Sequence, residues 1–301
     1  MARPRPPQLR SGPFFAGANL PWRDFGYDFG VDNFDAEFFS QTFAQLAAYG
    51  ANAVRVWLHA DGRGSPSFGA GGVVTGPGGH SFVADLHALT ALARAHRLVL
   101  QLCLWSFDMC KLTSGTHADL IQDMNKTSSY IHHALLPILR AIGDDPNVII
   151  EVINEPEWCL LGTCTTDQCV SVAHMQRFTA AIASAVHVSS PLLVTTGCAS
   201  LKWMSKHARP ESGEAFLWSD GALQSAYPAG GASSVLDLYN AHFYDWMVEW
   251  GYDPCNSSAA AWGLDKPCVI GELPATSAIY TAEGMLDCAL EHGCARCCPA
   301  S

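Results

Sequence analysis

Apolar and polar residues follow two spacings along this chain, one typical of strands and one typical of helices. The run Val148-Ile149-Ile150-Glu151-Val152-Ile153 is short and β-branched, and it stops at Asn154-Glu155-Pro156. Such a run predicts a parallel strand buried on both faces, whose pairing ends at Pro156. Residues 35–49 instead place apolar side chains at helical spacing, with Gly50 at the expected C-cap.

The same patterns repeat in alternation. We predict strands at 14–22, 53–58, 98–105, 148–154, 191–196, 235–243 and 267–271. We predict helices at 35–49, 82–96, 119–142, 167–188, 220–225 and 281–292, with a kink or restart at Pro137 and a glycine-rich loop at 61–79. Seven strands that alternate with helices, without a linker, predict an α/β fold of the (β/α)8 TIM-barrel class. Residues 14–301 would form this single domain, preceded by a disordered tail at 1–13.

The amino-acid composition limits the classes of binding partner and the cellular compartment that we expect for this protein. The chain has 301 residues and a net charge of −11, and only 15% of its residues are charged. This balance argues against a nucleic acid or an anionic membrane surface as a partner. Twelve cysteines indicate an oxidising, extracellular compartment. The basic, proline-rich start has no apolar segment of a secretory signal, which a start site cut back past a signal peptide would explain.

A second carboxylate follows a second predicted strand. Glu272 comes directly after Val269-Ile270-Gly271, as Glu155 comes after the run at 148–154. In a barrel, the ends of the fourth and seventh strands face the same mouth. Retaining glycosidases need two carboxyl groups about 5 Å apart, one as acid/base and one as nucleophile. The alternative for Glu155 is a polar turn after a core strand.

Charged and aromatic residues near other strand ends fit the same site. Arg55 lies inside a buried strand, where its charge is costly unless a carboxylate pairs with it. We expect that partner at the barrel mouth, and a core Asp paired with Arg55 for stability is the alternative. His242 and Tyr244 alternate so that both point to one side, although a lone His-x-Tyr is more often structural. The tryptophans expected just beyond strand ends could stack on sugars or simply pack the rim: Trp105, Trp158 and Trp246.

These residues carry a resemblance to glycoside hydrolase family 5. Asn154-Glu155-Pro156 resembles its acid/base motif, Gly271-Glu272 its nucleophile, and Arg55 and His242-x-Tyr244 its second- and sixth-strand residues. The stretch Gly17-Ala18-Asn19-Leu20-Pro21-Trp22 and the later stretches resemble invertebrate endo-β-1,4-mannanases. Those later stretches are Tyr27-Asp28-Phe29-Gly30, Val74-Thr75-Gly76-Pro77, Tyr244-Asp245-Trp246 and Leu264-Asp265-Lys266-Pro267.

The resemblance implies roles for the residues that match. Glu155 would protonate the glycosidic oxygen and later activate water, while Glu272 attacks the anomeric carbon. Asn154 would hold the sugar 2-hydroxyl, and Tyr244 would orient Glu272. His242 would assist, and Trp105 would line the subsite beside the cleaved bond. The substrate would be a β-linked polysaccharide or oligosaccharide; no metal or cofactor is expected, and we expect a monomer.

The end of the chain departs from the family pattern. The family continues into an eighth strand, which carries a tryptophan, and an eighth helix, but here the chain runs Cys294-Ala295-Arg296-Cys297-Cys298 to Ser301. We therefore expect a truncated barrel that lacks the last strand and helix. Two alternatives to a mannanase follow: a β-1,4-glucanase of the same family, and a glycan-binding relic that no longer cleaves its ligand.

The cysteines suggest several uses. Three of them cluster after Glu155, near Cys110, and predict a rim stapled by disulfides: Cys159, Cys164 and Cys169. A zinc site with Cys294, Cys297 and Cys298 is an alternative without a paired CxxC motif to support it. The cysteines in predicted strands are expected as small core residues: Cys103, Cys198 and Cys268.

Overall fold

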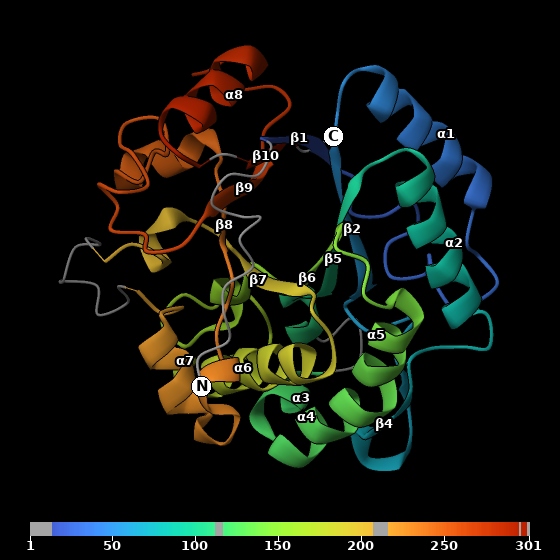
Figure 1. Cartoon of the computed structure of the whole chain (residues 1–301). Helices are drawn as coiled ribbons and strands as arrows, with labels where there is room; N and C mark the ends of the chain where they lie inside the picture. Colours follow the sequence, from blue (N-terminus) through green and yellow to red (C-terminus); the bar gives the residue numbers. More distant parts are fainter. Residues whose placement is uncertain (1–13, 112–116, 207–215, 295, 300–301) are drawn as a thin grey trace.

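Eight parallel strands pair into a closed barrel, surrounded by helices (Figure 1). The computed structural model describes residues 14–111, 117–206, 216–294 and 296–299. The strand order around the barrel is β1-β10-β9-β8-β7-β6-β5-β2. Their bounds are β1 (Phe15–Asn19), β2 (Ala53–Ala60), β5 (Val99–Ser106), β6 (Val148–Asn154), β7 (Leu193–Cys198), β8 (Tyr239–His242), β9 (Cys268–Leu273) and β10 (Arg296–Pro299). The predicted TIM-barrel fold is therefore confirmed.

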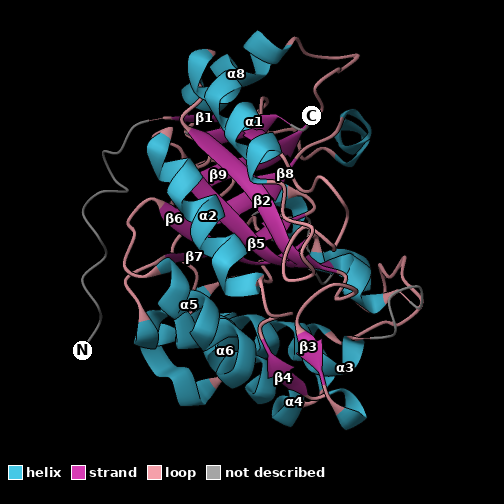
Figure 2. Ribbon diagram, turned by 90° about the vertical axis from the view of Figure 1, so that its right-hand side faces the viewer, coloured by secondary structure: helices cyan, strands magenta, loops and turns pink. Residues whose placement is uncertain are grey.

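The helices lie outside the strands, and Figure 2 shows α1 and α2 packed along the barrel. Their bounds are α1 (Ala36–Ala48), α2 (Phe82–Ala95), α3 (Ala118–Gln122), α4 (Met124–Tyr130), α5 (Leu136–Ile142), α6 (Val172–Ser189), α7 (Asp220–Ala226) and α8 (Ala282–Glu291). Short polar side chains start several of them, because an N-cap oxygen satisfies an otherwise unpaired backbone N–H. Asp35 accepts from the Phe38 N–H in this way, and Ser171 from that of His174.

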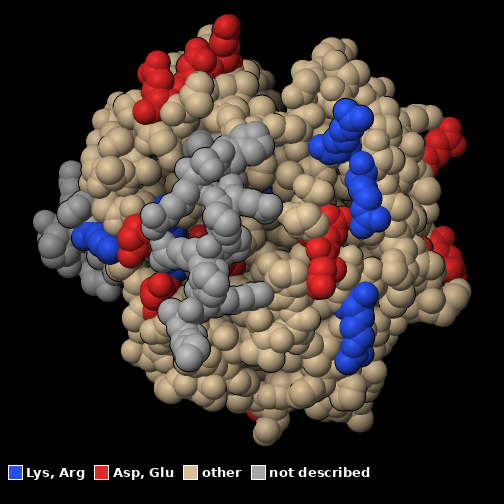
Figure 3. All heavy atoms as spheres, viewed as in Figure 1, with Lys and Arg blue, Asp and Glu red and all other residues tan. Residues whose placement is uncertain are grey.

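The core lies inside the barrel and between the barrel and its helices. Every residue of β2 and β6 is buried, as the β-branched run at 148–153 predicts for a strand covered on both faces. Leu86 and Leu89 of α2 pack into the same core cluster as Val54 and Val56 of β2. The outer surface carries few charges, and most of the face in Figure 3 is uncharged; the exceptions include acidic side chains over α8 at the upper left and basic side chains on the right-hand side.

Two of the predicted elements differ from the structure. The long helix predicted at 119–142 is divided into α3, α4, a π-helical turn at Ile131–Leu135 and α5. One break falls at Asp123, which caps α4, and the predicted restart at Pro137 is also present, since α5 begins at Leu136 after the π-helical turn and Pro137 lies in its first turn. The glycine-rich loop at 61–79 contains a small hairpin, β3 (Ser67–Phe68) with β4 (Val74–Gly76).

The end of the barrel also needs a correction. The expected gap is filled by β10, which pairs with β1 on one side and β9 on the other. Four residues without a β-branched run carry no strand signal, so this strand could not be recognised from its sequence pattern. No helix follows β10 in the part of the chain that the structure describes. The predicted tail at 1–13 lies outside the described residues.

The cysteines are used in two ways. Cys164 pairs with Cys169 in the loop after β6, as the predicted rim requires, and Cys255 pairs with Cys288 of α8, which was not predicted. The remaining cysteines with described side chains are buried thiols: Cys103, Cys110, Cys159, Cys198, Cys268 and Cys294. The side chains of Cys297 and Cys298, on which the zinc alternative depends, lie outside the described residues. Among the described helices, none has the length and apolar character needed to cross a membrane.

Candidate active site

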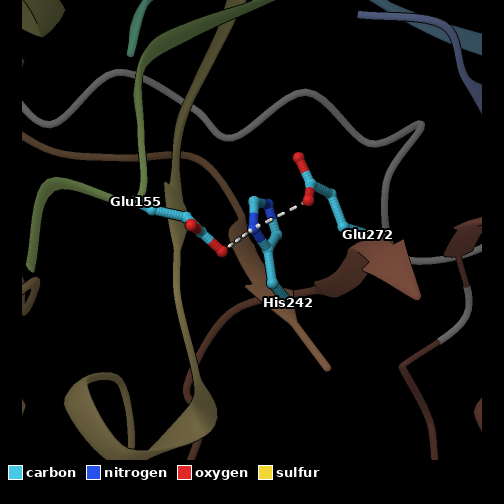
Figure 4. Close-up of side chains that lie close together, drawn as sticks. All are labelled: Glu155, His242 and Glu272. Carbon is cyan, nitrogen blue, oxygen red and sulfur yellow. Dashed lines mark hydrogen bonds and ion pairs between the residues drawn. The ribbon is translucent and has the colours of Figure 1, made fainter. Parts of the chain in front are cut away.

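Two glutamates from opposite sides of the barrel meet at one histidine. Glu155 follows β6, Glu272 lies in β9, and His242 ends β8 between them (Figure 4). The Nδ1 atom of His242 lies 2.9 Å from Glu155 Oε1 and 3.7 Å from Glu272 Oε2. One oxygen of each carboxylate and the histidine nitrogen all lie within 4.8 Å of one another. The structure therefore brings the two predicted carboxylates together.

The backbone at Glu155 explains how the side chain reaches this position. Glu155 has φ 46° and ψ 53°, a left-handed conformation that costs a residue with a Cβ about 1–2 kcal/mol. Its N–H still donates to Gly197 O, at 2.6 Å. The chain then turns into the 3₁₀ helix η6 (Pro156–Cys159), which returns Trp158 to Glu155. The indole N–H of Trp158 donates to Glu155 Oε2 at 2.9 Å, so both oxygens of Glu155 have a partner.

The second glutamate is held by two strong donors. Arg55 Nη1 donates to Glu272 Oε1 at 2.6 Å, and the Tyr244 hydroxyl donates to Oε2 at 2.7 Å. Burial alone would raise the pKa of Glu272. The positive charges of His242 and Arg55, together with these hydrogen bonds, outweigh burial and hold the pKa below its ordinary value. Glu272 is therefore an ionised carboxylate at neutral pH.

His242 is affected in the opposite direction. Burial would lower its pKa, but the charge of Glu272 and the hydrogen bond to Glu155 raise it above the ordinary value. Burial strongly raises the pKa of the Tyr244 hydroxyl, and the negative charge of Glu272 raises it further. The phenol is therefore protonated. Each glutamate thus has a different set of neighbours, a common way in which proteins separate the tasks of two carboxyl groups.

Arg55 connects the site to the barrel interior. Its side chain is fully buried and pairs with Glu272 at the mouth, as predicted, and also with Glu151 below it. Arg55 therefore has a core partner as well, but this partner is a glutamate and not the aspartate considered as the alternative. Arg55 Nη2 also donates to Asn154 Oδ1, at 2.7 Å. Because Asn154 accepts through its oxygen, its amide nitrogen is the group that can donate to a bound molecule.

A bulge in β6 places Glu151 and Asn154 on the same side. Residues three apart normally face opposite sides of a strand. Here Glu151 pairs with Thr195 and Asn154 with Gly197, so β6 has one more residue than β7 over this interval. Such an extra residue re-aims the side chains that follow it. Both side chains consequently reach the guanidinium of Arg55.

A cleft of about 460 Å³ opens beside the two glutamates. It is lined by Asn19, Pro21, Trp22, Trp57, Phe107, Asp108, Asn154, Glu155, Tyr244 and Glu272. Sequence reasoning did not select Trp57, Phe107 or Asp108 for the site. Trp22, which is 38% exposed, ends the predicted strand at 14–22, so the strand-end criterion applied to other tryptophans could have identified it.

The three predicted tryptophans have different surroundings. Trp105 is fully buried inside β5 and packs against His59 and Tyr130, so the prediction that it lines a sugar subsite is wrong. The strand extends to Ser106, which places Trp105 within it rather than beyond its end. Trp158 is partly buried and touches Glu155, and Trp246 is 47% exposed beside it, with ring centroids 6.2 Å apart.

Known proteins resemble this chain over most of its length, although no family model matches it. A mannan endo-1,4-β-mannosidase from Mytilus edulis is 30% identical over 282 residues, which cover 86% of this chain and 75% of the relative. A second mannan endo-1,4-β-mannosidase, from Cryptopygus antarcticus, is 28% identical over 283 residues, which cover 86% of this chain and 72% of the relative. The solved structure of a β-1,4-mannanase from the sea hare Aplysia kurodai superposes with a TM-score of 0.86 at 26% identity, covering 96% of this chain and 88% of the other.

The barrel and its paired glutamates place the protein among the glycoside hydrolases. Identity at this level over nearly the whole barrel narrows the class further. The chain belongs to the family of mannan endo-1,4-β-mannosidases, the invertebrate type within glycoside hydrolase family 5. The resemblance found in the motifs is therefore confirmed.

Proposed function

We propose that this protein is a retaining endo-glycosidase that hydrolyses β-1,4-mannosidic bonds in mannan, glucomannan or galactomannan. The observation that carries the retaining mechanism is the short separation of Glu155 and Glu272, whose oxygens lie within 4.8 Å. Retaining enzymes hold their carboxyl groups about 5–5.5 Å apart, whereas inverting enzymes leave about 6.5–9.5 Å for a water molecule. The names of the relatives support mannan as the substrate.

In the first step, Glu272 attacks the anomeric carbon and forms a covalent glycosyl ester. Glu155 gives its proton to the glycosidic oxygen as the bond from that oxygen to the anomeric carbon breaks. The ionised state of Glu272, supported by Arg55 and Tyr244, suits a nucleophile. In the second step, Glu155 takes a proton from water, the water oxygen bonds to the anomeric carbon, and Glu272 leaves as a carboxylate.

Neighbouring residues would hold the substrate and the two glutamates. His242 Nδ1 forms a hydrogen bond with one oxygen of Glu155 and Trp158 donates to the other, which fixes the carboxyl group for proton transfer. The amide nitrogen of Asn154 would donate to the sugar 2-hydroxyl. Trp22 and Trp246, the exposed aromatic side chains near the glutamates, offer flat apolar faces on which sugar rings can stack.

The substrate is tested by incubating the purified protein with glucomannan, galactomannan and carboxymethylcellulose. Release of reducing ends from the two mannans alone supports the proposal. Release from carboxymethylcellulose alone would assign a β-1,4-glucanase, and binding of mannan without release would indicate a glycan-binding relic. Glu155→Gln and Glu272→Gln should each abolish hydrolysis, whereas Glu249→Gln, at an exposed carboxylate on the nearby turn, should retain it.

The two roles are separated by azide rescue with an activated aryl β-mannoside. Glu155→Ala should still form the glycosyl ester, so azide attacks it and gives the β-azide. Glu272→Ala lacks the nucleophile, so azide attacks the substrate directly and gives the α-azide. The reverse stereochemistry would exchange the roles of the two glutamates.

Domain extent and location belong to the same proposal. We propose that residues 14–301 form one catalytic domain that acts as an extracellular monomer. The two disulfides support an oxidising compartment, where such bonds persist. A thiol titration of the protein purified from its natural source should find Cys164, Cys169, Cys255 and Cys288 unreactive before reduction. A cytosolic form with all four thiols titrating would contradict the location.

A further inference from the structure

Glu151 is a buried carboxylate that the reaction described above does not use. It lies in the middle of β6 and is fully inaccessible to solvent. Its two oxygens accept from Arg55 Nε at 2.7 Å and from Arg55 Nη2 at 2.6 Å. This bidentate arrangement fixes the orientation of a guanidinium as well as its position.

Other side chains hold Glu151 itself in place. Gln101 Nε2 donates to Oε2 at 2.6 Å and Asn240 Nδ2 donates to the same oxygen at 3.2 Å, while Cys103 Sγ lies 3.3 Å from Oε1. These donors come from β5 and β8, on either side of the barrel interior. A buried carboxylate with all its acceptor positions used is a rigid anchor, whereas one left unpaired would be strongly destabilising.

The remaining donors of Arg55 point toward the mouth of the barrel. Nη1 donates to Glu272 Oε1 at 2.6 Å and to Asn19 Oδ1 at 3.0 Å. Glu151 therefore binds one edge of the guanidinium and Glu272 the other. Three buried charges lie in the order negative, positive, negative, and the positive charge is shared between two carboxylates.

We propose that Glu151 is a positioning residue for the nucleophile, which acts by fixing the orientation of Arg55 against Glu272 and by neutralising part of the charge of Arg55. Without Glu151, the guanidinium would stay against Glu272 but would no longer be fixed in its orientation, and its full charge would bind Glu272 in the ground state. Either change weakens attack on the anomeric carbon. This inference rests on the proposed role of Glu272 as nucleophile.

The first test is Glu151→Gln, measured on glucomannan over a range of pH. Because Glu151 does not reach the cleft, kcat should fall about tenfold or more while KM stays within about twofold. Removing a negative charge behind Arg55 should also move the acidic limb of kcat/KM to lower pH, by about half a unit or more. A folded variant with unchanged kcat and limb, or a loss confined to KM, would overturn the proposal.

A double-mutant cycle separates positioning from general damage to the barrel. If Glu151 acts through Arg55, Glu151→Gln should reduce kcat much less in an Arg55→Ala background than in the wild type, measured with an activated aryl substrate. An equal reduction in both backgrounds would overturn the inference.

Glu151→Asp covers the case in which Glu151→Gln does not fold. It keeps the charge but shortens the side chain by one methylene. We therefore expect kcat to fall, while KM and the acidic limb of kcat/KM stay unchanged. A wild-type kcat in this variant would contradict the positioning role.

The outcomes distinguish the two proposals. Activity that survives Glu272→Gln defeats the proposed function, whereas activity lost in Glu272→Gln but intact in folded Glu151 variants defeats only this inference.

Discussion

Trp158 donates its indole N–H to the carboxylate of Glu155, three residues before it, across 2.9 Å. The contact depends on the left-handed backbone at Glu155 and the 3₁₀ helix that follows it. It changes the interpretation of Trp158, which the sequence predicted to be a surface for stacking sugars. Its ring also packs against Trp203 and Trp250, which limits the movement of the indole.

Trp158→Phe tests this contact, because phenylalanine keeps an aromatic ring but has no N–H donor. We expect kcat on glucomannan to fall about tenfold or more, since a hydrogen bond to a charged group contributes about 1.5–3 kcal/mol. KM should change little. Trp246→Phe is the matched control, and its effect should fall mainly on KM. A larger loss of kcat in Trp246→Phe would reverse this assignment.

Tyr244→Phe should alter the pH dependence of hydrolysis. The phenol donates to the ionised form of Glu272, so its removal raises the pKa of this carboxyl group toward the ordinary value. The acidic limb of kcat/KM should therefore move to higher pH, by about one unit for a bond of about 1.5 kcal/mol. Tyr280→Phe, which removes a hydroxyl bound to Asp253, should leave the limb in place. An unmoved limb in Tyr244→Phe would contradict the argument.

His242 should make the stability of the fold depend on pH. Its folded pKa is raised above 6.5, so the stabilisation is complete below about pH 6.5 and is lost as pH rises through the folded value. The unfolding free energy from urea titrations should therefore decline with rising pH, by up to about 1.4 kcal/mol per unit. His242→Asn should flatten this decline, whereas His87→Asn, at an exposed position on α2, should not. Equal slopes in His242→Asn and the wild type would rule out His242 as the source.

The two disulfides should differ in their contribution to stability. The bond between Cys255 and Cys288 spans 33 residues, and that between Cys164 and Cys169 only 5. By loop-closure entropy, these bonds contribute about 4 and about 2 kcal/mol. Serine pairs at 255 and 288 should therefore lower the unfolding free energy more than serine pairs at 164 and 169. The opposite order would show that native-state contacts outweigh loop length.

The sequence pattern predicts much of the site because the chemistry lies at the ends of buried strands. Glu155 and Glu272 are carboxylates that end apolar runs, and Arg55 is a charge inside one, so each breaks its local pattern. Glu151 breaks the pattern of its own strand in the same way. A search for opposite charges inside the buried strands of the barrel, including strands separated by one other strand, would have paired it with Arg55.

Other features depend on tertiary structure that no local pattern records. Trp105 follows an apolar run as the other site residues do, yet its strand continues past it and buries it. The four residues of β10 have a strand conformation because β1 and β9 offer unpaired edges on both sides, not because of their own composition. The left-handed backbone of Glu155 likewise requires the surrounding structure to impose it.

The extra residue in β6 has a consequence for engineering this site into another barrel. Transplanting only the catalytic residues onto a regular strand would point Glu151 and Asn154 in opposite directions, and Arg55 would lose one of its partners. The segment from 151 to 155 would have to be moved as a block, together with the section of β7 against which its register shifts. In such a graft, the extra backbone residue must be transferred together with the side chains, because it sets the direction in which they point.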